Sequence, residues 1–270
     1  EICACLVGSE MCIRDRIRIH HGHSFGLSYH TDRLYRSMRL LGIRPVTAPD
    51  EFTEIVEVVV EESEIEEGYV KIIVTRGSDD HNFTIPARSA LQPNVLVYGK
   101  PIDLNAIEKV QSGVNCITLD DDRGHHCDIL SLNQLNNMMA RAEAQKKNCY
   151  DAVFIKDGLL TEASHSNVCI VKAGVIWTPA TNEHMIRGVT RSLVLTRAAP
   201  SAGVTSIDEA SEPVRFEDMM TAEEVFLTNS QDGIIPVLSI DGNPIGGGKV
   251  GDVTKKIQEH YAHLMEDGLP

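Results

Sequence analysis

Strand-like apolar runs and helix-like apolar stripes alternate along almost the whole chain, and this order constrains the fold more than any other feature. The run at 69–75 predicts a strand, because its apolar side chains recur at every second position. Residues 30–41 predict a helix, because Leu34, Met38 and Leu41 fall on one face at helical spacing. Alternation of this kind predicts a mixed α/β (α+β) protein.

The chain is predicted to form two domains that meet at a turn-rich linker, residues 99–101. The smaller N-terminal α/β domain spans 17–100, and the larger C-terminal domain spans 101–270. Residues 1–16 hold three of the seven cysteines without alternation or a helical stripe, so we expect them to be a non-native leader. Further strands are expected near 95–98, 113–119, 152–156, 167–171, 175–177, 224–228 and 236–240, and helices near 131–147, 189–199 and 252–265.

The composition limits the classes of function. A net charge of −14 argues against binding to a nucleic-acid backbone, which requires clustered Lys and Arg. No apolar run is long enough to span a bilayer, so no membrane partner is expected. The odd number of cysteines, without a repeated C-x-x-C pair, predicts free thiols in a reducing compartment, and we expect a cytoplasmic protein.

Four short stretches place charged or hydroxyl side chains at the edges of regular elements, and together they indicate a phosphate-bearing cofactor. In the first, Arg33 follows a strand-to-helix turn and could fork two hydrogen bonds to a phosphate. The alternative is a helix-surface arginine that pairs with an acid. In the second, Gly188 precedes a helix start at Val189 and Thr190, whose N–H groups and hydroxyl could bind an anion. An ordinary helix cap is the alternative there.

The other two stretches add a carboxylate and a hydroxyl. Glu162 lies between a turn and a strand, where it could hold the protonated pyridine nitrogen of pyridoxal 5'-phosphate (PLP) and keep that ring an electron sink. A turn acid among hydroxyl caps is the alternative. Ser230 lies in a loop after a strand, and its hydroxyl could add a donor to the same phosphate.

Two histidine-rich clusters do not predict a metal site. They are His20, His21 and His23, and His125, His126 and Cys127. Adjacent side chains on a strand point to opposite faces, and no complementary pattern of acids follows either cluster. We therefore expect no metal ion and interpret these histidines as solvated turn residues.

Taken in order, the four stretches resemble the class IV aminotransferases, the fold type IV PLP enzymes, over nearly the whole chain. The motifs that carry the resemblance are Phe25-x-Leu27-x-x-His30-x-x-Arg33-Leu34-x-x-Ser37, Cys127-Asp-Ile-Leu-Ser-Leu-Asn133, Asp157-Gly-x-x-Thr161-Glu162-x-Ser164-x-Ser166-Asn167 and Gly188-Val-Thr190-Arg191. The Cys-Asp-Ile-x-Ser-Leu-Asn motif is most similar to the corresponding motif of the D-amino acid aminotransferases. The resemblance implies a two-domain fold type IV architecture, PLP as cofactor and usually a homodimer.

The resemblance also assigns roles to individual residues. It implies that Arg33, Val189, Thr190 and Ser230 hold the phosphate of PLP and that Glu162 holds its pyridine nitrogen. The substrates it implies are an amino acid, with D-amino acids as candidates, and a 2-oxo acid.

One position departs from the family. Where these enzymes have the lysine that forms a Schiff base with PLP and moves the substrate proton, this chain has Leu130. Leucine can do neither, and the loss of general base catalysis alone costs about 10²–10⁴-fold. The next lysines, Lys146 and Lys147, lie roughly 24 Å along the following helix at ~1.5 Å per residue. We therefore expect noncovalently bound PLP and impaired or altered activity.

The residues expected to bind the substrate carboxylate also differ from those of the family. D-amino acid aminotransferases have an Arg-x-His pair after a Thr-Arg-Gly turn, and a gapless match places His81 and Phe83 at that pair. Arg76 or His81 is then left to bind a different substrate. The tyrosine that the family supplies from its first strand falls at Arg14, inside the suspect leader.

Three hypotheses follow, and all of them turn on Leu130. The favoured one is an aminotransferase-fold protein that binds PLP noncovalently and has residual or altered amino-transfer activity. The alternative is a non-catalytic pseudoenzyme, or binding protein, on the same fold. In the third, Leu130 is a sequence error or a substitution in an otherwise normal enzyme. Whether the chain is an enzyme stays open at this point.

Overall fold

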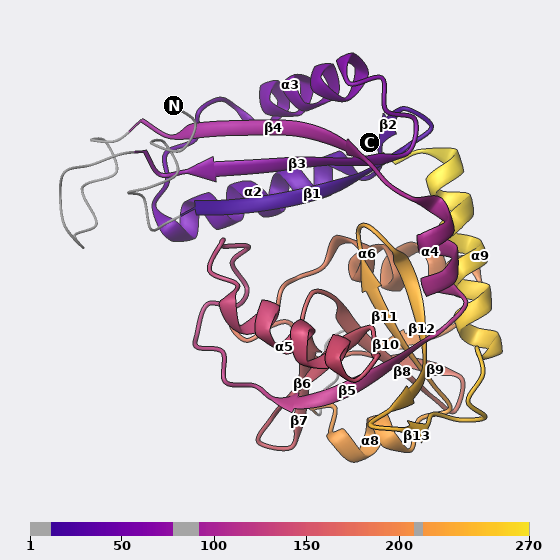
Figure 1. The fold of residues 1–270 in the computed structure, drawn as a ribbon. Coiled ribbons are helices and arrows are strands. Elements are labelled where there is room, and N and C mark those ends of the chain that lie inside the picture. Colours follow the sequence, from indigo (N-terminus) through magenta and orange to yellow (C-terminus); the bar gives the residue numbers. More distant parts are fainter. Residues whose placement is uncertain (1–11, 78–91, 208–212, 270) are drawn as a thin grey trace. The chain divides into compact units, whose positions relative to one another are not determined.

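The chain forms two compact units (Figure 1). The computed structural model describes residues 12–77, 92–207 and 213–269. Unit 1 is formed by the chain up to Ile102, together with Ile129–Asn133 and the residues from Gly268 on. Unit 2 is formed by Asp103–Asp128 and Gln134–Asp267. No helix within the described ranges is long and apolar enough to cross a membrane.

Unit 1 is built on a four-stranded antiparallel sheet in the order β2-β1-β3-β4. Its elements are β1 (Cys12–His20), β2 (His23–Ser24), α2 (Leu27–Leu41), α3 (Pro49–Glu62), β3 (Gly68–Thr75) and β4 (Asn94–Pro101). Residues 12–16, which belong to the suspect leader, are the first residues of β1 and pair with residues 71–75 of β3.

Two glycines set the ends of α2. Gly26 precedes the helix and Gly42 follows it, both with left-handed backbone (φ 67° and 65°) that glycine adopts without strain. Leu34 and Met38 lie on the buried face, as their spacing predicts, and share a core with Ile17 of β1. Unit 1 therefore has a hydrophobic core of its own.

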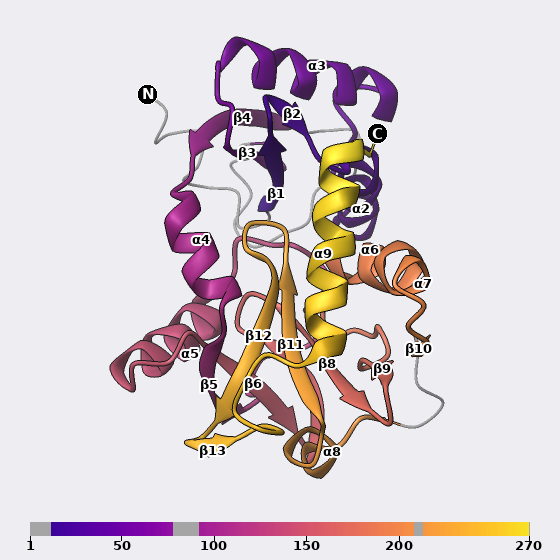
Figure 2. The same cartoon turned by 90° about the vertical axis from the view of Figure 1, so that its right-hand side faces the viewer.

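Unit 2 contains a nine-stranded mixed sheet among its described residues, in the order β10-β9-β8-β11-β12-β5-β6-β7 with β13 paired to β12. The strands are β5 (Val114–Asp120), β6 (Asp151–Lys156), β7 (Leu159–Ala163), β8 (Asn167–Lys172), β9 (Val175–Trp177), β10 (Ser206–Ile207), β11 (Glu224–Asn229), β12 (Gly233–Ile240) and β13 (Asn243–Pro244). The helices are α4 (Leu104–Gln111), α5 (Leu135–Lys146), α6 (Val189–Leu193), the π-helical turn η1 (Val194–Ala198), α7 (Ala199–Ser201), α8 (Phe216–Met220) and α9 (Asp252–Asp267). Helix α9 packs along the β11–β12 hairpin (Figure 2).

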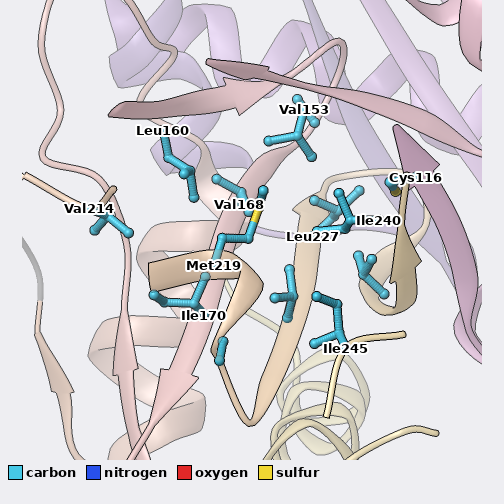
Figure 3. Close-up of a cluster of buried hydrophobic side chains, with 14 of the residues drawn as sticks. Cys116, Val153, Leu160, Val168, Ile170, Val214, Met219, Leu227, Ile240 and Ile245 are labelled. Atoms are coloured by element: carbon cyan, nitrogen blue, oxygen red, sulfur yellow. The ribbon is translucent and has the colours of Figure 1, made fainter. Parts of the chain in front are cut away.

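The two faces of this sheet differ in chemistry. Figure 3 shows the apolar core on one face, where Val168 of β8 and Leu227 of β11 meet Met219 of α8. Side chains alternate along a strand, so the next residues, Asn167 and Thr228, point to the other face. These two residues are also paired across β8 and β11, which places their side chains on the same side.

Two predicted boundaries are wrong by several residues. The residues predicted as a linker, 99–101, are the last ones of β4. The helix predicted from residue 131 begins at Leu135, because the preceding segment bonds to β1 instead. The Arg14 N–H donates to the Leu130 carbonyl and the Leu132 N–H donates to the Cys12 carbonyl, each over 2.9 Å. This segment, predicted to lie in the C-terminal domain, is part of unit 1.

Candidate active site

Glu162 occupies the centre of the site in unit 2. Its side chain, at the buried end of β7, accepts hydrogen bonds on both oxygens. Arg123 donates to Oε1, while the Ile186 N–H and the Asn167 amide donate to Oε2 over 2.9 and 3.3 Å. Burial raises the pKa of Glu162 to about 7, against the Arg123 guanidinium and the Ile186 amide, which favour the charged form. A carboxylate held this firmly can accept a further hydrogen bond from a ring N–H of a ligand.

Arg123, which no sequence motif singles out, anchors this carboxylate. Its guanidinium also donates to both oxygens of Asp121 and to the His184 carbonyl, and it stacks 4.3 Å from the centre of the Phe154 ring. Burial lowers the pKa of Arg123, but the hydrogen bonds to Asp121 and the charge of Glu162 outweigh burial and raise it. Arg123 is therefore a permanent cation beside Glu162.

Asn167 joins the stretch of Glu162 to the stretch of Gly188. Its amide nitrogen donates to the Ile186 carbonyl over 2.9 Å as well as to Glu162. A Cβ atom on Gly188 would lie only 2.0 Å from the Asn167 side-chain oxygen, so any other residue there requires Asn167 to move. The helical residues that follow, Val189 and Thr190, are buried, and the Thr190 hydroxyl lies 3.3 Å from the Tyr261 hydroxyl of α9.

Thr228 has the unsatisfied polar atom of this site. Its hydroxyl is buried and, among the described residues, has no hydrogen-bond partner. A buried hydroxyl without a partner costs free energy, so a ligand that accepts or donates there is favoured. Because Thr228 points to the same side of the sheet as Asn167, this atom fits a polar cofactor bound beside Asn167 and Glu162. In the sequence, the run Thr-Asn-Ser that contains Thr228 only weakly indicated a hydroxyl group at a phosphate site.

The turn that carries Ser230 is fixed from several sides. The Asn229 side chain accepts from the Asp232 N–H over 2.7 Å and donates to the Ser166 hydroxyl over 3.1 Å. The Tyr150 hydroxyl donates to Asp232 over 2.6 Å. The turn is thus connected to the stretch that contains Glu162, and three of the four predicted stretches meet in unit 2.

Arg33 lies in unit 1 and makes an ion pair there. It forks two hydrogen bonds to the buried Asp15 of β1, from Nε over 3.1 Å and from Nη2 over 2.6 Å. His30 lies 3.0 Å from the same carboxylate. Burial raises the pKa of Asp15, but the Arg33 and His30 partners outweigh burial and lower it. Arg33 therefore has an acid partner, as in the alternative interpretation, but the pair is largely buried and does not lie on the helix surface.

Two further predicted residues, Leu130 and Arg76, also belong to unit 1. Leu130 is buried, and its carbonyl accepts the Arg14 N–H. Arg76 follows β3, is buried, and has its Nη1 atom 3.5 Å from the Leu41 carbonyl. His81 lies outside the described residues.

Comparisons with known proteins identify the family of the chain. The sequence profile described as "Amino-transferase class IV" matches residues 13–240. The chain is 36% identical over 242 residues to a D-alanine aminotransferase of Bacillus licheniformis, covering 90% of this chain and 83% of the relative. It is 31% identical over 254 residues to a D-alanine aminotransferase of Staphylococcus aureus (strain N315), covering 94% and 88%.

The fold has solved counterparts as well. A branched-chain amino acid aminotransferase from T.th., solved in complex with N-(5'-phosphopyridoxyl)-L-glutamate, superposes with a TM-score of 0.82 at 23% identity and covers 97% of this chain and 87% of that one. This likeness confirms the predicted mixed α/β, fold type IV architecture. With the family profile and the curated relatives, it leads to one conclusion: the chain belongs to the class IV aminotransferase family.

Proposed function

We propose that this chain binds PLP noncovalently and transfers an amino group between an amino acid and a 2-oxo acid, with impaired or altered activity. The single observation that carries the proposal is Glu162, a buried carboxylate positioned by Arg123, Asn167 and the Ile186 N–H. A carboxylate of this kind suits the pyridine nitrogen of PLP. The solved counterpart that binds a phosphopyridoxyl compound supports the same cofactor.

The residues of the site divide into two tasks. We assign Glu162 to the pyridine nitrogen, and Arg33, Val189, Thr190 and Ser230 to the phosphate. The unsatisfied hydroxyl of Thr228 adds a hydrogen-bonding group beside Asn167. When bound, PLP supplies an electron sink for the α-carbon of an amino acid.

Leu130 limits what the chain itself contributes. Its aliphatic side chain can neither attach a cofactor nor move a proton, and we assign the proton transfer to free substrate amine or to water. General base catalysis contributes about 10²–10⁴-fold, so turnover falls by at least that factor relative to a lysine at the same position.

The substrate is proposed from the relatives and from one arginine. Both relatives are named D-alanine aminotransferases, which favours a small D-amino acid. Arg76 is our candidate for the substrate carboxylate, with His81 as a second, because a guanidinium fork matches a carboxylate. Neither residue reproduces the family's Arg-x-His pair, so a different substrate is the alternative.

We also propose a homodimer located in the cytoplasm. Helix α5 supports the dimer, because Leu135, Met138 and Met139 expose 66%, 70% and 55% of their surfaces. The cysteines in the described ranges are free thiols, which suits a reducing compartment.

The pseudoenzyme remains a second candidate function, and two observations favour it. Leu130 stands where the family has its catalytic lysine, and Arg33 forms an ion pair with the Asp15 carboxylate. A pseudoenzyme would bind a ligand in unit 2 without turnover.

The test compares the natural chain with Leu130→Lys and with the apolar control Leu130→Met. We expect all three to bind PLP in an absorbance titration. Only Leu130→Lys should keep PLP through denaturation after borohydride treatment, as mass spectrometry would show. That variant should also gain transamination of D-alanine with a 2-oxo acid by at least ~100-fold.

Two outcomes would decide against the proposal. If neither the natural chain nor Leu130→Lys binds PLP, the proposed cofactor is wrong, and the candidate that remains is a pseudoenzyme whose ligand is not PLP. If the natural chain turns over as fast as Leu130→Lys, the predicted impairment is wrong and another group does the work of the lysine.

A further inference from the structure

We propose that His125, Glu183 and His184 of unit 2 form a binding site for a divalent transition-metal ion such as Zn²⁺. Each side chain offers one ligand atom, and the three atoms lie within 4.8 Å of one another. The Glu183 carboxylate oxygen lies 3.2 Å from Nδ1 of His125 and 3.7 Å from Nε2 of His184. Zinc bonds of about 2.0–2.2 Å place neighbouring ligand atoms ~3–4 Å apart, so the spacing suits such an ion.

The donor set selects the class of metal. Two imidazoles and one carboxylate suit Zn²⁺ and its first-row neighbours, whereas Mg²⁺ and Ca²⁺ prefer oxygen donors alone. Three protein ligands also leave a coordination position for water. Along the sequence His125 groups with its neighbours His126 and Cys127, but its partners in space come from a loop far along the chain.

One backbone and one side-chain hydrogen bond hold the two loops together without a metal ion. The Cys127 N–H donates to the Glu183 carbonyl over 2.8 Å, and Arg123 Nη2 donates to the His184 carbonyl over 3.0 Å. The His184 N–H also donates to the Asn182 side chain over 2.8 Å. The ligands therefore stand on a fixed frame, which lowers the entropy cost of binding an ion.

An ordinary surface ion pair explains less of this arrangement. The side chains of His125 and Glu183 are 70% and 56% exposed, and an exposed pair contributes little. The His125–Glu183 pair also does not include Nε2 of His184, which lies 3.7 Å from the same oxygen. The exposure does keep the site open to an ion in solution.

The contact between Lys156 and His184 disfavours metal binding, because it places a positive charge beside a proposed ligand. Lys156 Nζ lies 3.5 Å from Nδ1 of His184, the ring nitrogen opposite the proposed ligand atom. When Nε2 binds a metal ion, the neutral ring carries its proton on Nδ1, so Lys156 cannot donate there. The contact is too long to be a strong hydrogen bond, and Lys156 is expected to turn away.

The site connects the two loops that hold Glu162. Arg123, two residues before His125, and Ile186, two residues after His184, both donate to that carboxylate. An ion that joins the loops therefore stabilises the folded state of unit 2, and the apparent Tm of the protein rises with metal concentration.

The test titrates the metal-free full chain with Zn²⁺ by calorimetry and records the absorption of Co²⁺ in its place. The background carries His260→Ala and His263→Ala, because these rings of α9 lie 6.1 Å apart and could add a second signal. We expect His125→Ala and His184→Ala each to weaken binding at least ~10-fold, since even partners that only orient a ligand contribute about 10- to 100-fold.

Two further variants sharpen the result. His126→Ala changes an exposed neighbour outside the cluster and should leave binding unchanged, whereas Lys156→Gln should tighten it. A visible Co²⁺ band that disappears in His125→Ala would support the site directly. The proposal would be overturned if the background with His260→Ala and His263→Ala bound no metal. It would also be overturned if adding His125→Ala or His184→Ala to that background left the affinity unchanged.

Discussion

At the residue scale, opposing influences set the charge of Glu162. Burial disfavours its carboxylate form, while Arg123 and the Ile186 amide favour it, and the pKa is raised from 4.5 to about 7. Between these values the folded state keeps a proton that the unfolded state has released. The free energy of unfolding therefore falls as pH rises from 4.5 to 7, and the contribution of protonated Glu162 is fully present below pH 4.5.

This linkage predicts a stability change that Glu162→Gln removes. From about pH 5 to about pH 8, the natural chain should lose up to about 3 kcal/mol more unfolding free energy than the variant, at ~1.36 kcal/mol per pKa unit. Urea unfolding of the cofactor-free proteins at both pH values measures the difference, and titrations shared by the two proteins cancel. Parallel pH profiles would mean that Arg123 keeps Glu162 ionised throughout.

Asp15 and Arg33 give a second prediction at this scale. If Arg33 holds the phosphate of PLP, the Asp15 carboxylate competes with that phosphate. Asp15→Asn should then tighten PLP binding by about tenfold or more, because hydrogen bonds to charged groups contribute about 1.5–3 kcal/mol. It should also lower stability, because breaking a buried ion pair costs about 3–5 kcal/mol.

The double variant with Arg33→Ala is the control for Asp15→Asn. PLP titration followed by fluorescence should show that the gain in affinity disappears when Arg33 is absent. An equal gain with and without Arg33 would remove Arg33 from the phosphate site and leave the ion pair with Asp15 as its role.

The residues of the site differ in how far the sequence could predict them. Glu162 and Thr190 stand in motifs beside turn residues, so the sequence pointed to both. Arg123 follows three aspartates and looks like part of a solvated charged turn. Only the tertiary structure turns its guanidinium onto Glu162. The unsatisfied hydroxyl of Thr228 is likewise a property of packing, which no sequence pattern records.

At the scale of elements, the missed helix α3 shows where periodicity fails. Its buried side chains, Phe52, Val56 and Val60, recur at every fourth position, as a helix requires. Ile55 and Val58 lie on the exposed face, however, and are 42% and 56% exposed. Apolar residues on both faces hide the stripe, and β-branched valines favour strands.

The contact between Gly188, directly before α6, and Asn167, the first residue of β8, gives a prediction at the same scale. Gly188→Ala places a Cβ against the Asn167 side chain, which two hydrogen bonds hold in position. Overpacking of this kind costs about 1–3 kcal/mol, and displacing Asn167 should also weaken PLP binding. The shift in the urea midpoint and a PLP titration measure the two effects.

Gly247→Ala is the matched control, because a Cβ at Gly247 has no heavy atom within 4 Å. It should leave both the urea midpoint and PLP affinity close to those of the natural chain. If Gly188→Ala behaves like this control, Asn167 moves without cost and the close packing around Gly188 does not shape the site.

At the scale of the whole molecule, the order of motifs predicted the family, while the path of the chain between the units was not predictable. Residues 129–133 return to unit 1, where two backbone hydrogen bonds to β1 hold them. Pairing between segments far apart in sequence leaves no local periodicity. For this reason the sequence placed Leu130 in the right motif but in the wrong unit.

The proposed homodimer gives the last prediction. Leu135, Met138 and Met139 of α5 expose large apolar side chains, and a second copy of the chain that covers them would remove this surface from water. Leu135→Glu combined with Met138→Glu should therefore shift the protein from dimer to monomer in sedimentation equilibrium, since a buried unpaired charge opposes association. Glu143→Gln on the same helix, an exposed side chain paired with Lys146, should leave the dimer intact. A natural chain that sediments as a monomer would reject the homodimer, whereas a dimer that survives both glutamates would place its interface away from α5.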